Sequence, residues 1–379
     1  MNQRIKSYVD EHYELMLTTL RELCQIPAPS HHEDARAAYC KQWLESIGAT
    51  NVAIDEAKNV LFGINCEQSD NITVIAAHTD VVFPDTTPLP MREDDEKIYC
   101  PGVSDDTANL IVLMTLAKFF VENTIKPRDG ILFVCDTCEE GLGNLKGVRQ
   151  IFKDYAGRVR QFVSLDGGYN CIRNHCVGSH RYKIEVTTEG GHSYSKFGNK
   201  NAIAVLADIV SAIYAIEVPQ KEGTHTTYNV GTISGGNSVN TIAQNAQMLC
   251  EYRSDDIECL AVMKEKFAAI FEDADTQDAK VTVTLVGERP CADINKQKVD
   301  DLVDRVMPVF EEVLGTKLPC LSSSTDCNIP LSLGIPAFCV GTCIEHGAHT
   351  REEWVDKASM RVGLEIAIKM ALKLTEETI

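Results

Sequence analysis

Five side chains that can bind a metal ion follow short apolar or glycine-containing segments of this sequence. They are two histidines, two aspartates and one glutamate: His78, Asp105, Glu140, Asp166 and His349. These nitrogen and oxygen ligands, with no thiolate among them, favour catalytic divalent ions over a closed structural zinc site. Two such ions held close together activate water for hydrolysis. The set therefore predicts a two-metal hydrolase.

Two further aspartates, Asp80 and Asp106, lie next to members of this set. Asp80 follows His78 by two residues and suits the orientation of a metal-bound imidazole, although such a triplet also occurs at ordinary loop ends. Asp105 is followed by Asp106 and precedes a predicted helix. A carboxylate there can bridge two cations, and helix capping is the alternative.

Glu139 and Glu140 form an adjacent pair of carboxylates before Gly141. Neighbouring side chains in an irregular turn point in different directions, so one can bind metal while the other transfers a proton. A solvated acidic turn is the alternative interpretation. His192, between glycines and Ser193, can donate to a developing oxyanion, although histidines are also common in loops without such a role.

The elements that must position these residues alternate between strands and helices. Apolar runs at 72–77, 131–134 and 162–165 predict buried parallel strands, and their carboxyl ends carry His78, the Glu139–Glu140 pair and Asp166. Open α/β sheets build their sites at this edge. Further elements are expected as helices at 2–24 and 33–47, a strand pair at 51–65, a loop at 84–101 and a long helix after Asp106. The fold class expected is α/β, with a doubly wound, mostly parallel sheet.

The pattern changes after residue 178. Residues 182–188 alternate with period two, as a half-buried antiparallel strand does, and 201–216 is amphipathic. Strands at 226–233, 246–252 and 280–286 and a helix at 256–271 complete a compact module. We therefore expect a catalytic domain formed by 1–178 and 291–379, interrupted by an α+β lid domain at 179–290. The helix at 201–216 is the expected interface if the lid mediates a dimer.

Composition limits the partners and the location. The chain has 379 residues and a net charge of −19, which repels nucleic acid and anionic membranes. No apolar stretch reaches the roughly 18–20 residues that span a bilayer, and no signal-peptide core begins the chain. The 15 cysteines are scattered, so we expect reduced core residues in a cytoplasmic protein. The spacing of Cys135 and Cys138 resembles a redox motif, but both are expected in a strand, facing opposite sides.

Taken in order, these features resemble the dinuclear zinc metallopeptidases that include peptidase T, carboxypeptidase G, acetylornithine deacetylase and succinyl-diaminopimelate desuccinylase. The matching segments follow the family order over nearly the whole chain: AAHTDVV, GVSDDTANL, DTCEEGLGN, SLDGG, GGHSY, GGNSVNTIAQNA, EYRSDD, STDCNIPLSLGIPAF and GAHTREEW.

The resemblance implies a role for each candidate ligand. Asp105 would bridge two divalent ions, with His78 and Asp166 completing one ion and Glu140 and His349 the other. Zinc is the expected metal, and cobalt and manganese suit the same ligands. A cis peptide bond after the bridging aspartate is also implied.

The resemblance assigns the remaining site residues as well. Glu139 would be the general base and acid, and Asp80 the partner of His78. His192 would polarise the scissile carbonyl, from the same chain or across a lid-mediated homodimer. The positions of Asn240 and Arg253 match lid residues that hold the substrate carboxylate or backbone, a role for which a guanidinium is well shaped.

Two departures bear on the substrate and the helix start. Thr107 follows the aspartate pair where many relatives have Lys, and Asp166 is Asp where carboxypeptidase and deacylase members usually carry Glu. The second departure favours a zinc aminopeptidase acting on short peptides with a free N-terminus. A deacylase or carboxypeptidase of the same family is the alternative, and a non-catalytic metal- or peptide-binding protein is a third class.

Overall fold

The computed structural model describes residues 2–377, which divide into two compact units. The first unit comprises Met1–Cys176 with Asp293–Ile379, and the second comprises Val177–Ala292. The second unit begins two residues before residue 179 and ends two residues after residue 290, the bounds expected for the lid. Among the described residues, no helix is long and apolar enough to cross a membrane.

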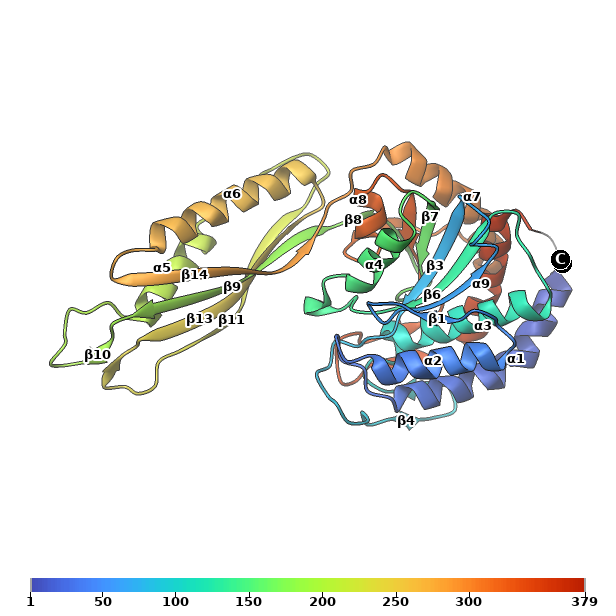
Figure 1. Cartoon of the computed structure of the whole chain (residues 1–379), viewed down its shortest axis with the longest axis horizontal. Helices are drawn as coiled ribbons and strands as arrows, with labels where there is room; N and C mark the ends of the chain where they lie inside the picture. Colours follow the sequence, from blue (N-terminus) through green and yellow to red (C-terminus); the bar gives the residue numbers. More distant parts are fainter. Residues whose placement is uncertain (1, 378–379) are drawn as a thin grey trace. The chain divides into compact units, whose positions relative to one another are not determined.

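The first unit is built on a largely parallel eight-stranded sheet of order β1-β2-β6-β3-β7-β16-β8-β15 (Figure 1). The central strands β6, β3, β7 and β16 run parallel, whereas β1 and β2 form an antiparallel edge. The strands are β1 (Ala53–Ile54), β2 (Val60–Ile64), β3 (Ile72–His78), β6 (Gly130–Asp136), β7 (Val159–Ser164), β8 (Ile172–Cys176), β15 (Cys320–Ser323) and β16 (Ala337–Cys339). Every residue of β3 and β6 is buried, as expected for central strands covered on both faces.

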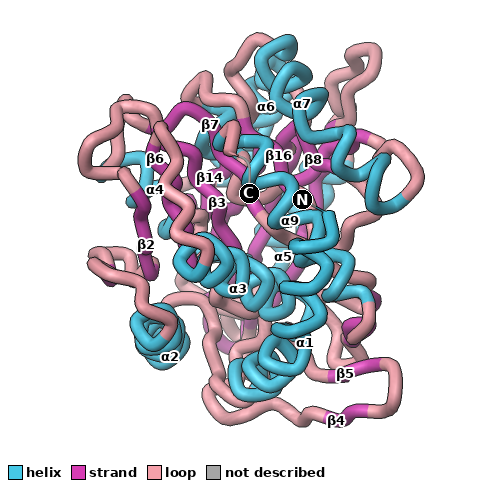
Figure 2. The backbone as a smooth tube through the Cα atoms, turned by 90° about the vertical axis from the view of Figure 1, so that its right-hand side faces the viewer, coloured by secondary structure: helices cyan, strands magenta, loops and turns pink. Residues whose placement is uncertain are grey.

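Helices cover both faces of this sheet, which makes it doubly wound. Ile75 of β3 and Val163 of β7 belong to the same buried cluster as α1, α3 and α9, whereas the neighbouring Phe162 contacts Phe152 of α4 on the other face. Figure 2 shows α1, α3 and α9 side by side. The helices are α1 (Asn2–Cys24), α2 (Asp34–Ser46), α3 (Ala108–Glu122), α4 (Lys146–Asp154), α7 (Lys296–Leu314), α8 (Asn328–Ser332) and α9 (Ser359–Thr375). The predicted α/β class is confirmed.

The segment 84–101, expected to be a loop, contains two short strands. β4 (Arg92–Glu93) and β5 (Lys97–Tyr99) join β17 (Glu345–His346) and β18 (Trp354–Asp356) in a small antiparallel sheet. The ammonium of Lys97 also lies 3.7 Å from the centre of the Trp354 ring. Partners some 250 residues away stabilise β5, and three residues carry too little local pattern to predict a strand.

The second unit is a four-stranded antiparallel sheet, order β11-β13-β9-β14, with α5 and α6 packed on one face. Its elements are β9 (Gly178–Thr188), β10 (Gly191–His192), α5 (Ala202–Tyr214), β11 (Thr226–Gly235), β12 (Thr241–Ile242), β13 (Asn245–Ser254), α6 (Ile257–Ala274) and β14 (Ala279–Arg289). Alternate residues of β9 and β13, such as Ile184 and Met248, form its core. The strands and helices predicted for the lid are confirmed.

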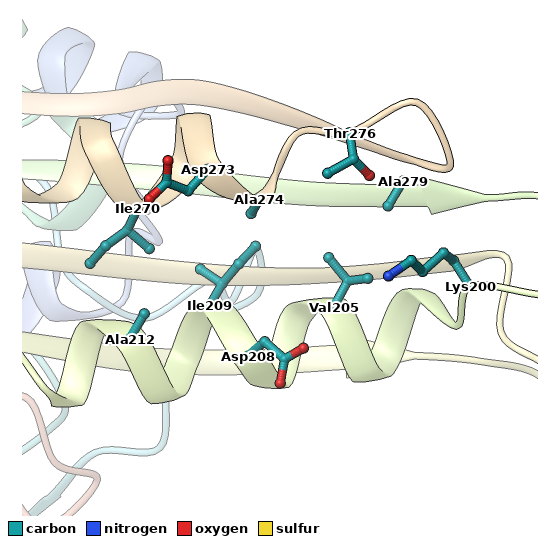
Figure 3. A pocket seen from close by; sticks show the side chains of 10 residues that line it. All are labelled: Lys200, Val205, Asp208, Ile209, Ala212, Ile270, Asp273, Ala274, Thr276 and Ala279. Atoms are coloured by element: carbon teal, nitrogen blue, oxygen red, sulfur yellow. The ribbon is translucent and has the colours of Figure 1, made fainter.

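A cavity of about 320 Å³ lies between α5 and the end of α6 (Figure 3). Its lining is mainly apolar, and its charged side chains are Lys200, Asp208 and Asp273. No histidine or cysteine lines this cavity, so it offers a metal ion no imidazole or thiolate ligand.

Candidate dinuclear metal centre

Three neighbouring parallel strands bring candidate ligands to one edge of the sheet. β3 lies between β6 and β7, and all three run in the same direction. His78 is the last residue of β3, Glu140 follows the end of β6, and Asp166 follows the end of β7. This is the carboxyl edge of the sheet, where open α/β sheets form their sites.

The fourth ligand, Asp105, lies in the irregular turn η1 (Val103–Thr107) before α3. The Asp105–Asp106 peptide bond is cis, as the resemblance implies. The buried carboxylate of Glu353 accepts hydrogen bonds from the backbone N–H groups of Gly102, Ser104 and Asp105, at 2.7, 2.7 and 2.9 Å. Glu353 therefore fixes the turn, a role that was not predicted although the residue lies in the matched segment GAHTREEW.

The carboxylate of Asp105 presents one oxygen to each of two imidazoles. His78 Nε2 lies 3.1 Å from Oδ1, and His349 Nε2 lies 3.0 Å from Oδ2. His349 Nε2 is also 3.2 Å from Glu140 Oε1. A carboxylate shared in this way has the geometry of a bridging ligand between two ions.

Asp166 approaches the same centre from the loop after β7. Ligand atoms of His78, Asp106 and Asp166 lie within 4.8 Å of one another, as do those of His78, Asp105 and Glu140. Asp106 was not among the predicted site residues. Its Oδ2 accepts the N–H of His78 at 3.0 Å and its Oδ1 accepts Asn109 Nδ2 at 2.7 Å, so its carboxylate braces the site.

Asp80 holds three parts of the site together. His78 Nδ1 lies 3.0 Å from the carbonyl oxygen of Asp80, which leaves Nε2 available to a metal ion. Oδ1 of Asp80 accepts the N–H of Glu139, and Oδ2 accepts the N–H of Glu140 and the hydroxyl of Ser30, the last at 2.6 Å. Asp80 therefore also fixes the glutamate turn, which is more than the predicted orientation of an imidazole.

The electrostatics of the cluster call for cations. Burial raises the pKa of Glu140 and of Asp166, and the negative charge of Asp105 raises both further. Burial also acts on Asp105, but hydrogen bonds from His349 and His78 bring its pKa below the ordinary value. Buried carboxylates this close repel one another unless positive charge lies between them. The nitrogen and oxygen donor set suits two divalent ions of the zinc, cobalt or manganese type.

Glu139 lies beside this centre and is 6% exposed. Its backbone is held by Asp80, as described above, and it directly precedes the ligand candidate Glu140. Its role as the general base and acid remains a prediction.

The predicted lid residues lie in the second unit, and two of them are neighbours. His192 pairs with Thr241 across β10 and β12, and the N–H of Ser193 donates to the carbonyl of Asn240 at 3.0 Å. Arg253 pairs with Ser179 at the opposite end of β13, and its Nε donates to Glu251 at 2.7 Å. Arg253 lies eight residues along β13 from Asn245, the first residue of the strand, which corresponds to roughly 26 Å. Asn240 is on the side of Asn245. The roles of these three residues remain predictions.

The expectation for the two cysteines of Cys135-Asp136-Thr137-Cys138 is corrected in part. β6 ends at Asp136, so Cys138 lies in the following turn and not in the strand. Both thiols are buried, and Cys138 donates to Glu33 Oε1 at 3.2 Å. Fourteen of the fifteen cysteines are buried and Cys320 is exposed, so nearly all of them are core residues, as predicted.

Comparisons with known proteins agree with this architecture. A tripeptidase from Staphylococcus aureus is 22% identical in sequence, with a TM-score of 0.75, over 95% of this chain and 98% of that one. Aminopeptidase PepT from Bacillus cereus is 19% identical, with a TM-score of 0.71, over 96% of this chain and 98% of that one. The N-acetyldiaminopimelate deacetylase of Bacillus pumilus is 20% identical over 372 residues, which are 93% of this chain and 96% of the relative.

The family assignment rests on a broader match. The sequence profile of peptidase family M20/M25/M40 matches residues 74–373, which include all five candidate metal ligands. The chain belongs to peptidase family M20/M25/M40.

Proposed function

We propose that this hydrolase is a zinc aminopeptidase that removes the N-terminal residue of short peptides with two bridged divalent ions. The observation that carries the proposal is the bridging position of Asp105 between His78 and His349, with Glu140, Asp166 and Glu139 beside it. When bound, the two ions lower the pKa of a water molecule and polarise the scissile carbonyl.

The protein groups then have distinct tasks. Glu139 accepts the proton of the attacking water and delivers it to the nitrogen of the departing amine. His192 donates to the carbonyl oxygen as negative charge develops there. Asn240 and Arg253 hold the backbone or the terminal carboxylate of the peptide.

A further carboxylate supports recognition of a free amino terminus. Glu345 is two residues beyond Cys343, whose backbone forms an isolated parallel β-bridge with Gly168. A Cβ placed on Gly168 would lie 3.7 Å from Cγ of Glu345. Its side chain therefore lies against the loop that carries Asp166. Burial and the charges of Asp105 and Asp166 raise the pKa of Glu345. Within residues 2–377, no hydrogen bond or ion pair engages its carboxylate.

A substrate α-ammonium lies two bonds from the scissile carbonyl carbon and therefore close to the divalent ions, which repel it. An unengaged carboxylate at Glu345 offsets this repulsion by pairing with the ammonium. The identity of Asp166, typical of the aminopeptidase and dipeptidase members, favours the same substrate class. The two structural relatives described as a tripeptidase and an aminopeptidase are consistent with it.

The deciding experiment compares Ala-Ala-Ala with N-acetyl-Ala-Ala-Ala. The proposal expects kcat/KM to be at least about 100-fold higher for the free peptide, since a buried charged contact is lost on acetylation. Glu345→Gln should reduce this preference mainly through KM, whereas Glu352→Gln, at an exposed glutamate in the loop between β17 and β18, should leave it unchanged.

Equal or faster cleavage of the acetylated peptide would reject the aminopeptidase. It would favour a deacylase, the activity that the name of the Bacillus pumilus relative describes. Hydrolysis of neither peptide, nor of any member of a mixed di- and tripeptide library, would favour a binding protein on this fold.

A further inference from the structure

Arg36 is a buried cation behind the candidate metal centre. It belongs to α2, is 2% exposed, and forms no ion pair with any residue between 2 and 377. Arginine stays charged at physiological pH, so its guanidinium brings a full positive charge into the interior. Buried charges are unfavourable unless hydrogen bonds compensate them, and the partners of Arg36 therefore show what the charge is used for.

Those partners include both ligand-bearing segments. Nη1 donates to the carbonyl oxygen of Thr79 at 2.9 Å and to the hydroxyl of Thr107 at 3.1 Å. Thr79 lies between His78 and Asp80, and Thr107 directly follows the Asp105–Asp106 pair. Nε donates to the carbonyl oxygen of Ile26 at 2.8 Å, which anchors the guanidinium to the segment just after α1. One planar group thus connects the segment of His78 to the segment of Asp105.

Burial and nearby thiols act on this charge, with Asp80 as a further, smaller influence. Burial lowers the pKa of Arg36, while the nearby groups Cys24, Cys40, Cys100 and Asp80 favour its charged form. The contacts of the guanidinium itself are with the backbone of Thr79 and the hydroxyl of Thr107, the segments that carry His78 and Asp105. Thr107 occupies the position where many relatives carry Lys, and in this chain a cation from α2 lies beside that position instead.

We propose that Arg36 is a positioning residue that fixes the separation of His78 from Asp105 and thereby sets the affinity for metal. This inference rests on the candidate metal centre of the proposed function, but not on the substrate. Its planar fork matters as well as its charge, because Nε must reach Ile26 while Nη1 reaches Thr79 and Thr107.

The test measures zinc affinity by competition with a chromophoric chelator and, separately, the thermal stability of the metal-free protein. Arg36→Met should weaken zinc binding about 10-fold or more, in the range found for outer-shell partners of metal ligands. Arg36→Lys should recover part of this loss. Thr107→Val, which removes one acceptor at nearly constant shape, should weaken binding by a smaller factor.

Arg158→Met is the matched control. Arg158 is partly buried in the same unit and also donates to backbone carbonyl oxygens, those of Cys66 and Ser69, away from the candidate ligands. Its loss should lower the melting temperature of the metal-free protein and leave zinc affinity unchanged. Arg36 variants that behave like this control would overturn the inference.

Two further outcomes are decisive. If Arg36→Met does not fold, unchanged zinc affinity in both Thr107→Val and Arg36→Lys rejects the positioning role. A wild-type chain that binds neither zinc, cobalt nor manganese rejects both the inference and the metal centre. Tight zinc binding without cleavage of any peptide rejects only the proposed function.

Discussion

At the scale of single residues, hydrogen-bond partners distinguish the carboxylates that can bind metal from those that support the site. Asp105 and Asp106 are adjacent, yet Asp105 faces two imidazoles while Asp106 accepts hydrogen bonds from His78 N–H and Asn109. In the Glu139–Glu140 pair, it is Oε1 of Glu140 that lies 3.2 Å from Nε2 of His349. Residue type alone does not distinguish the members of either pair, and the backbone turn decides which carboxylate can bind metal.

This division gives a direct prediction for Glu139. Glu139→Gln should lower kcat by about 10²- to 10⁴-fold, since an amide does not accept the proton of water, while leaving the metal ligands intact. Steady-state kinetics together with metal analysis of the same sample measures both effects. Exposed Glu352→Gln serves as the control. Loss of bound metal in Glu139→Gln, or activity near that of the wild type, would contradict its role as the base.

At the scale of elements, the turn before Asp105 depends on close packing at Gly102. Its φ is 76°, and a Cβ there would lie 2.4 Å from Val81 Cγ1. Gly157 has a similar φ of 74° but nothing within 4 Å of an added Cβ. Alanine substitutions at Gly102 and Gly157 therefore allow the cost of backbone strain to be measured apart from the cost of steric overlap.

Gly157→Ala should lower the free energy of unfolding by about 1 kcal/mol, the cost of a left-handed alanine. Gly102→Ala should lower it by at least about 1 kcal/mol more, because Val81 must move. Chemical denaturation of the metal-free proteins measures both values. Zinc affinity should fall only in Gly102→Ala, and equal behaviour of the two variants would show that the contact with Val81 is unimportant.

Elements also show how far the sequence predicts this structure. The apolar runs of β3, β6 and β7 end at His78, Asp136 and Ser164, so the strands and the ligand edge follow from local pattern. Arg36 and Glu353 could not be predicted in the same way. Each acts through contacts with residues distant in sequence, such as Glu353 with Gly102, and a lone buried charge leaves no periodic signal. The strand β5 was missed for the same reason.

At the scale of the whole molecule, we propose that the lid unit mediates a homodimer. β11 is an edge strand of the lid sheet, and Ile233 on it is 58% exposed. Ile203 and Tyr214 of α5, the helix expected at the interface, are also exposed. Unpaired strand edges and exposed apolar side chains favour association with a second copy.

Sedimentation equilibrium should give a dimer for the wild type at micromolar concentration. Ile233→Lys should shift it towards monomer, because a charge on the edge strand opposes pairing. Leu333→Lys, at a residue of the first unit that is 57% exposed, should leave the dimer intact. A monomeric wild type would contradict the proposal and would require His192 to act within its own chain.

We propose that this chain is a peptidase that depends on two divalent ions, which Asp105 would hold together. The most direct measurement adds zinc stepwise to the metal-free protein and follows hydrolysis of Ala-Ala-Ala. We predict no activity with excess chelator and a rise in activity that ends at two equivalents of zinc per chain, with Asp105→Asn inactive throughout. Full activity in the presence of chelator, or a plateau at one equivalent, would contradict it.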